Sequence, residues 1–166
     1  MSERSGRLRL ELWVPVVILA LDQATKALVR QALPLHESVT IVPGFLDFTH
    51  IRNTGAAFGF MDTTDLPYKT LLLSAVAVAS LVGVGFYAAG LPREQRLARW
   101  GLALILGGAA GNLIDRVTAG FVVDFVDVYW RTYHFWAFNV ADSAISVGVV
   151  LWLLDALTTH HVSQAS

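Results

Sequence analysis

The chain has 166 residues, is 55% hydrophobic and has a mean hydropathy of +0.56, which is too apolar for a soluble domain of this size and indicates an integral membrane protein. Its formal net charge is −1 and its Lys and Arg residues lie between apolar runs, so composition gives no basis for a nucleic-acid partner. Cysteine is absent, which excludes disulfides, thiolate metal sites and cysteine nucleophiles, and leaves oxygen and nitrogen side chains to supply any chemistry.

Four apolar segments are long enough to cross a hydrocarbon core of roughly 30 Å. They lie at about residues 12–32, 70–90, 97–115 and 139–158. They predict one membrane domain over residues 1–166, with an all-α polytopic fold. Arginines precede the first segment and lie between the second and third, so the positive-inside rule places both termini in the cytoplasm. These arginines are Arg4, Arg7, Arg9, Arg93, Arg96 and Arg99.

The two longer connections then lie on the outer face of the membrane. In the first, about residues 36–60, LDFTHIR alternates as a half-buried strand does and Pro43-Gly44 is a turn signal, which predicts a small extracytoplasmic β-sheet. The small residues Gly55, Ala56 and Ala57 leave room for the backbone of another chain. The second connection, about residues 117–137, is rich in aromatic residues that favour the lipid headgroup level.

Two polar clusters interrupt the apolar helices. Asp22 and Lys26 are spaced i, i+4 and share one helix face, and we favour a structural ion pair over a catalytic role for them. Asn112, Asp115 and Arg116 lie within one turn at the outer end of the third segment. Arg116 there is able to pair with Asp115 and to bond a peptide or phosphate group, while capping and charge pairing is an equally good explanation of the cluster.

Asp124 and Asp142 are the candidate catalytic acids. An Asp at a helix start is more often an N-cap, but Asn139 is the better cap candidate and leaves Asp142 inside the helix. Two carboxylates in a poorly hydrated site share a proton, which allows one to take a proton from water while the other donates one to a carbonyl oxygen. Serine-type catalysis is less well supported, since His134 is the only histidine near these acids in sequence. No metal-binding pattern is present.

Five blocks of the sequence resemble those of lipoprotein signal peptidase, also called signal peptidase II. They are DQATK at 22–26, RNTGAAFGF at 52–60, GGAAGNLIDR at 107–116, VVDF at 122–125 and FNVADSAIS at 138–146. The resemblance implies an aspartic protease of the bacterial inner membrane with four transmembrane helices, a small extracytoplasmic sheet and a short extracytoplasmic helical segment. Such an enzyme removes the signal peptide from diacylglyceryl-modified prolipoproteins, on the amino side of the lipidated Cys.

The resemblance also assigns roles to residues of this chain. Asp124 and Asp142 correspond to the catalytic pair, with Asp124 expected on a loop. Supporting or substrate-binding roles fall to Asn53, Asn112, Arg116, Asn139, Asp115, Asp22 and Lys26. The expected partners are prolipoprotein substrates and membrane lipid, with no cofactor or metal, and the chain is expected to be a monomer. Two other classes remain open: a small ion-coupled transporter or proton relay, and a structural membrane subunit.

Overall fold

The structure is a computed structural model that describes residues 3–55 and 68–164, with side chains described over 12–55 and 68–158. Its helices are α1 (Glu3–Ala32), α2 (Lys69–Gly90), α3 (Arg96–Ala119) and α4 (Val140–Gln164). Each contains a segment long and apolar enough to cross a membrane, at Leu12–Ala32, Lys69–Gly90, Arg96–Ala119 and Val140–Thr158. The four expected spanning helices are therefore confirmed, and the chain is a multi-pass membrane protein.

Helix α3 is the centre of the bundle and packs against all three other helices. Its small residues allow this close approach. A Cβ added to Gly111 would lie 2.5 Å from Asp22 Oδ2 of α1, and one added to Gly101 would lie 2.5 Å from the carbonyl oxygen of Gly148 in α4. A methyl group would meet the carboxylate of Asp22 at position 111 and the backbone of α4 at position 101, so both positions favour glycine.

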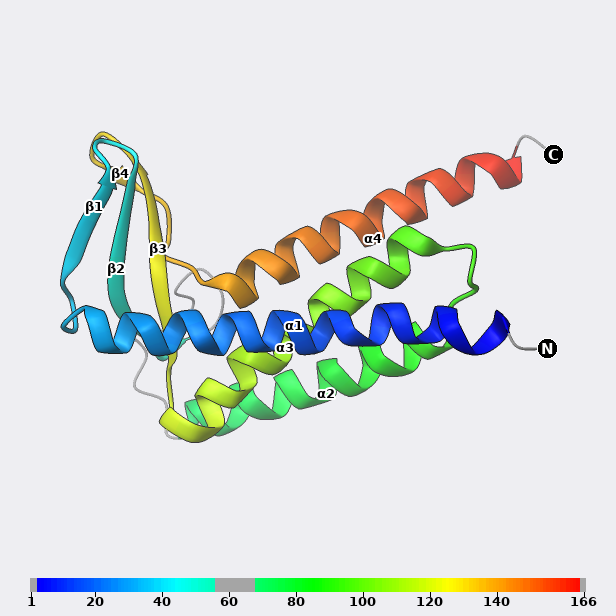
Figure 1. Cartoon of the computed structure of the whole chain (residues 1–166), viewed down its shortest axis with the longest axis horizontal. Helices are drawn as coiled ribbons and strands as arrows, with labels where there is room; N and C mark the ends of the chain where they lie inside the picture. Colours follow the sequence, from blue (N-terminus) through cyan, green and yellow to red (C-terminus); the bar gives the residue numbers. More distant parts are fainter. Residues whose placement is uncertain (1–2, 56–67, 165–166) are drawn as a thin grey trace.

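A four-stranded antiparallel sheet lies at one end of the bundle, with strand order β1-β2-β3-β4. The strands are β1 (Ser38–Val42), β2 (Leu46–Asn53), β3 (Val122–Trp130) and β4 (Tyr133–His134). The opposite end of the bundle holds the start of α1, the end of α4 and the connection between α2 and α3 (Figure 1). The predicted strand over LDFTHIR is confirmed as β2, and Gly44 takes a left-handed conformation with φ of 79° in the turn before it.

Residues 120–137 contain no helix, so the short helical segment expected at about 117–137 is wrong. Helix α3 continues to Ala119 and ends at Gly120, which has φ of 82° and whose N–H donates to the carbonyl of Arg116. β3 then pairs with β2, which supplies hydrogen-bond partners for its backbone, and its four β-branched valines favour a strand. Asp124 therefore lies on a strand and not on a loop. The expectation for Ala56 and Ala57 falls outside the described residues.

Candidate active site

Asp142 lies in the first turn of α4, where it and Asn139 cap the helix reciprocally. Asn139 Oδ1 accepts the N–H of Asp142 at 3.0 Å, and the N–H of Asn139 donates to Asp142 Oδ2 at 3.3 Å. This arrangement satisfies two backbone donors that a helix N-terminus leaves unpaired. The expected cap role of Asn139 is confirmed. Asp142 is the third residue after the cap, and its carboxylate faces the positive end of the helix dipole.

Asp124 is brought to the same asparagine from the sheet. It is 3% exposed, and its neighbour across the strand pair is Ile51 of β2. Asn139 Nδ2 donates to Asp124 Oδ1 at 2.7 Å, and Asn53 Nδ2 donates to Asp124 Oδ2 at 3.0 Å. Asn139 therefore donates to both acids, with its amide to Asp124 and its main chain to Asp142.

The environment of Asp124 favours its protonated form. Burial of the carboxyl group, followed by the negative charge of Asp142, raises the pKa of Asp124 from 3.8 to about 7. Hydrogen bonds from Asn53 and Asn139 and the charge of Lys26 oppose this change and are outweighed. At neutral pH the site therefore contains a carboxyl group that is able both to hold and to release a proton, as acid/base catalysis requires.

A buried polar cluster from α1 and α3 supports the acids. Asn112 Nδ2 donates to Asp142 Oδ1 at 2.8 Å, and Lys26 Nζ donates to Asn112 Oδ1 at 2.9 Å. Lys26 also pairs with Asp22 at 2.8 Å and with Asp115 at 3.0 Å. The ion pair between Asp22 and Lys26 expected from their spacing is confirmed, and both side chains are 0% exposed. The contacts of Lys26 extend beyond this local pair. They include Asp115 and Asn112 of α3, and Asn112 in turn contacts Asp142.

The expected pairing of Asp115 with Arg116 is replaced by other contacts. Asp115 faces α1, where it pairs with Lys26 and with Arg30 at 3.0 Å. Arg116 points elsewhere, since successive helical residues are rotated by about 100°. It donates to the carbonyl of Gly55 at 3.1 Å, which is the peptide contact that its planar guanidinium allowed.

Two residues of this cluster were missed from sequence. Arg30 is one further i, i+4 step along the face of α1 that carries Lys26, so helical spacing was sufficient to find it. Gln23 donates to Asp22 Oδ2 at 3.1 Å and to Asp115 Oδ1 at 3.4 Å. The rarity of asparagine in the sequence also indicated the site. The chain contains three asparagines, and each donates its side-chain amide to Asp124 or Asp142.

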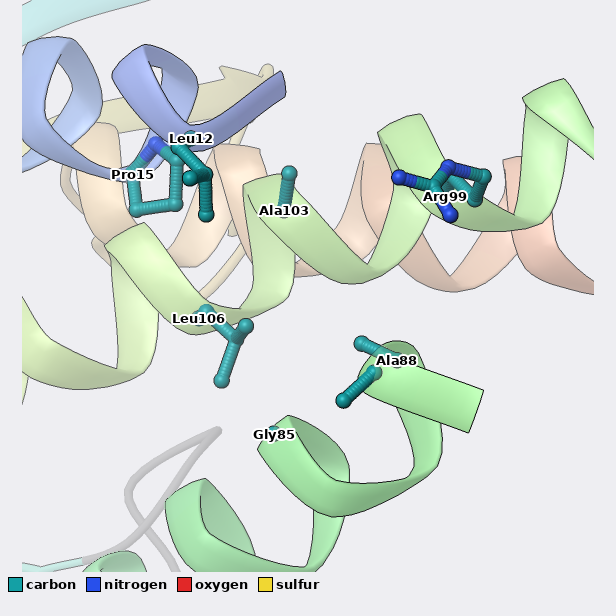
Figure 2. A pocket seen from close by; sticks show the side chains of 8 residues that line it. Leu12, Pro15, Gly85, Ala88, Arg99, Ala103 and Leu106 are labelled. Carbon is teal, nitrogen blue, oxygen red and sulfur yellow. The ribbon is translucent and has the colours of Figure 1, made fainter. Parts of the chain in front are cut away.

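Two other features do not join the site. His134 Nδ1 lies 2.8 Å from Asp127 Oδ2, so the histidine nearest in sequence contacts Asp127 and not Asp124. A cavity of about 440 Å³ lies between α1, α2 and α3, in the half of the bundle away from the sheet. Figure 2 shows that its lining is small and aliphatic apart from Arg99. Among the described residues that line it there is no acid, so this cavity is not a continuation of the site around Asp124 and Asp142.

The fold and these side chains define a class: a multi-pass membrane protein that holds two acids together at one end of its helix bundle. The sequence profile of the family "Signal peptidase (SPase) II" matches residues 14–158. The chain therefore belongs to the signal peptidase II family, and it is a peptidase of the aspartic type.

Individual relatives agree with this family. The lipoprotein signal peptidase of Geobacter metallireducens is 49% identical over 144 residues, which are 87% of this chain and 88% of that protein. The one from Syntrophotalea carbinolica is 47% identical over 151 residues, 90% of this chain and 91% of that protein. A solved structure described as a bacterial membrane enzyme at 2.3 Å resolution superposes with a TM-score of 0.79 at 30% identity, covering 89% of this chain and 87% of that one.

Proposed function

We propose that this chain removes the signal peptide from diacylglyceryl-modified prolipoproteins, cutting on the amino side of the lipidated Cys, with Asp124 and Asp142 activating water. The observation that carries the proposal is the position of Asn139, which donates to both acids from between β3 and α4. The relatives named lipoprotein signal peptidase support the choice of substrate.

In the proposed reaction Asp142 is ionised and takes a proton from a water molecule, whose oxygen attacks the scissile carbonyl carbon. Protonated Asp124 donates to the carbonyl oxygen, which gives a neutral tetrahedral intermediate. The intermediate then loses a hydroxyl proton to Asp124, and the proton held by Asp142 passes to the leaving amine as the C–N bond breaks. The raised pKa of Asp124 supports its assignment as the acid. No covalent intermediate with the enzyme is needed.

The supporting residues have separate roles in this proposal. Asn53, Asn112 and Asn139 hold the acids in place with amide donors. Asn53 and Arg116 line the substrate site, since Asn53 contacts Asp124 from the end of β2 and Arg116 contacts the carbonyl of Gly55, two residues beyond it. Both side chains are therefore next to the point where a peptide would reach Asp124.

We further propose that the sheet and the acids lie at the extracytoplasmic face of the bacterial inner membrane, with both termini in the cytoplasm and the chain acting as a monomer. Arg93, Arg96 and Arg99 support this orientation. They lie in the connection between α2 and α3 and at the start of α3, which is the end of the bundle opposite the sheet (Figure 1). A site at the membrane boundary lets the acyl chains of the substrate stay in lipid. Extraction would cost about 0.8 kcal/mol for each CH₂ group.

The test is cleavage of a diacylglyceryl-modified precursor by the purified protein, followed by gel shift, with an unlipidated precursor as the substrate control. Asp124→Asn and Asp142→Asn should each reduce the rate by at least about 100-fold, since each removes one proton-transfer group. Asp127→Asn is the matched control, because Asp127 lies on the same strand as Asp124 but contacts His134. A wild-type rate in either dyad variant would refute the assignment.

The alternative is a transporter or proton relay, which needs ionisable groups spread through the depth of the membrane. Asp155 is buried in α4, thirteen residues from Asp142, or about 20 Å along the helix. The residues between them, from 143 to 154, contain no ionisable side chain. The sequence of α4 therefore provides no proton relay between Asp142 and Asp155, which favours the peptidase over the transporter.

A further inference from the structure

The ammonium group of Lys26 has three N–H donors, and three acceptors surround it. Asp22 Oδ2 lies at 2.8 Å, Asn112 Oδ1 at 2.9 Å and Asp115 Oδ2 at 3.0 Å. A fully buried lysine is stable only when its charge is paired and its donors are satisfied. Arg30 adds a second positive charge next to Asp115, so two cations balance the two acids of this cluster. Lys26 is therefore satisfied without contacting Asp124 or Asp142.

The two carboxylates that pair with Lys26, those of Asp22 and Asp115, each accept a backbone N–H just before a candidate catalytic acid. Asp22 Oδ1 accepts the N–H of Ala141 at 3.0 Å, and Ala141 immediately precedes Asp142. Asp115 Oδ2 accepts the N–H of Val123 at 3.4 Å, and Val123 immediately precedes Asp124. Asp124 lies on strand β3 and Asp142 on helix α4, whereas Asp22 and Asp115 come from α1 and α3. These backbone bonds are made by Asp22 and Asp115 themselves, and no atom of Lys26 is a donor or acceptor in them.

The third contact of Lys26 determines which way the amide of Asn112 faces. An ammonium group is a donor only, so the atom of Asn112 that faces it must be Oδ1, and Nδ2 then faces Asp142. Asn139 Nδ2 adds a longer contact to the same oxygen at 3.3 Å. The amides of Asn53 and Asn139 are oriented differently, by the backbone N–H groups of Gly55 and Asp142. Asn112 is thus the asparagine whose orientation depends mainly on a charged side chain.

We propose that Lys26 is a positioning residue for the acid pair, which acts by keeping the amide of Asn112 turned so that its NH₂ group donates to Asp142. This proposal rests on the proposed function. Without Lys26, the carbonyl of Asn112 is free to turn toward Asp142, where two acceptors would face each other. Asp142 would then lose a donor and move away from the geometry it shares with Asp124.

The test is a double-mutant cycle with Lys26→Gln, Asn112→Ala and the combined variant, measured on the diacylglyceryl-modified precursor. Lys26→Gln should lower kcat by at least about tenfold, the effect of losing one hydrogen bond to a charged group, and leave KM within about twofold. Asn112→Ala should lower kcat similarly, and the combined variant should be no worse than Asn112→Ala. Thr25→Ala is the control on the same helix, because Thr25 immediately precedes Lys26 and its hydroxyl donates to the backbone carbonyls of Leu21 and Asp22 in α1, and it should leave kcat unchanged.

Additive effects on kcat, or a loss confined to KM, would overturn the positioning role. If Lys26→Gln does not fold, Asn112→Asp decides the question. That variant has the same shape and still accepts from Lys26, but its ionised side chain has no proton to donate to Asp142. A kcat at least about tenfold below wild type supports the proposal, and a wild-type kcat overturns it. If the wild-type protein itself does not cleave the precursor, the proposed function fails instead.

Discussion

Asp124→Asn should remove a pH dependence of stability as well as activity. In the folded protein the pKa of Asp124 is about 7, against 3.8 for an ordinary Asp. Between these values the folded chain binds a proton that the unfolded chain has lost, so stability falls as pH rises through this window and is constant above it. From pH 5 to pH 8 the interval covers about two pKa units, or about 3 kcal/mol at ~1.36 kcal/mol per unit.

The measurement is thermal unfolding in detergent, followed by the fluorescence of the five tryptophans, at pH 5 and at pH 8. The substituted amide turns an NH₂ group toward either Asn53 or Asn139, which costs stability equally at both pH values. The comparison across pH therefore isolates the titration of residue 124. The midpoint of the variant relative to wild type should rise by about 6 to 12 °C between pH 5 and pH 8. The same relative midpoint at both pH values would refute the protonation of Asp124 at neutral pH.

Three further outcomes are expected. The value of kcat/KM should fall about tenfold per pH unit above about 7, as Asp124 loses its proton, and a pH-rate profile that stays flat to about pH 9 would count against this acid. Gly111→Ala should lower the unfolding midpoint and kcat together, because its Cβ would lie 2.5 Å from Asp22 Oδ2, whereas Gly83→Ala, with nothing within 4 Å of its Cβ, should do neither; equal effects would contradict the packing argument. Asn139→Ala should cost about 1 to 2 kcal/mol of stability through loss of the cap, and at least about tenfold in kcat; an active variant with only the stability loss would limit Asn139 to capping.

The parts of the site that could be predicted from sequence depend on short separations along the chain. The Asp22–Lys26 pair follows from helical spacing, and the cap at Asn139 follows from the residues around the start of α4. The four spanning helices follow from hydropathy alone. In each case the partners lie within one turn or one helix, so the local backbone conformation already decides whether they meet.

Strand pairs and ion pairs between residues distant in sequence could not be predicted from local spacing. Residues 122–130 form strand β3 because β2, which ends at residue 53, supplies hydrogen-bond partners for it, and no local pattern contains that pairing. Asp115 pairs with Lys26 and Arg30 rather than with adjacent Arg116 because α1 packs against that face of α3. The sequence by itself determined the spanning helices, the local ion pair and the cap. Only the tertiary structure decided which buried charges meet, because a charge inside a bundle takes the partner that the neighbouring helix or strand presents.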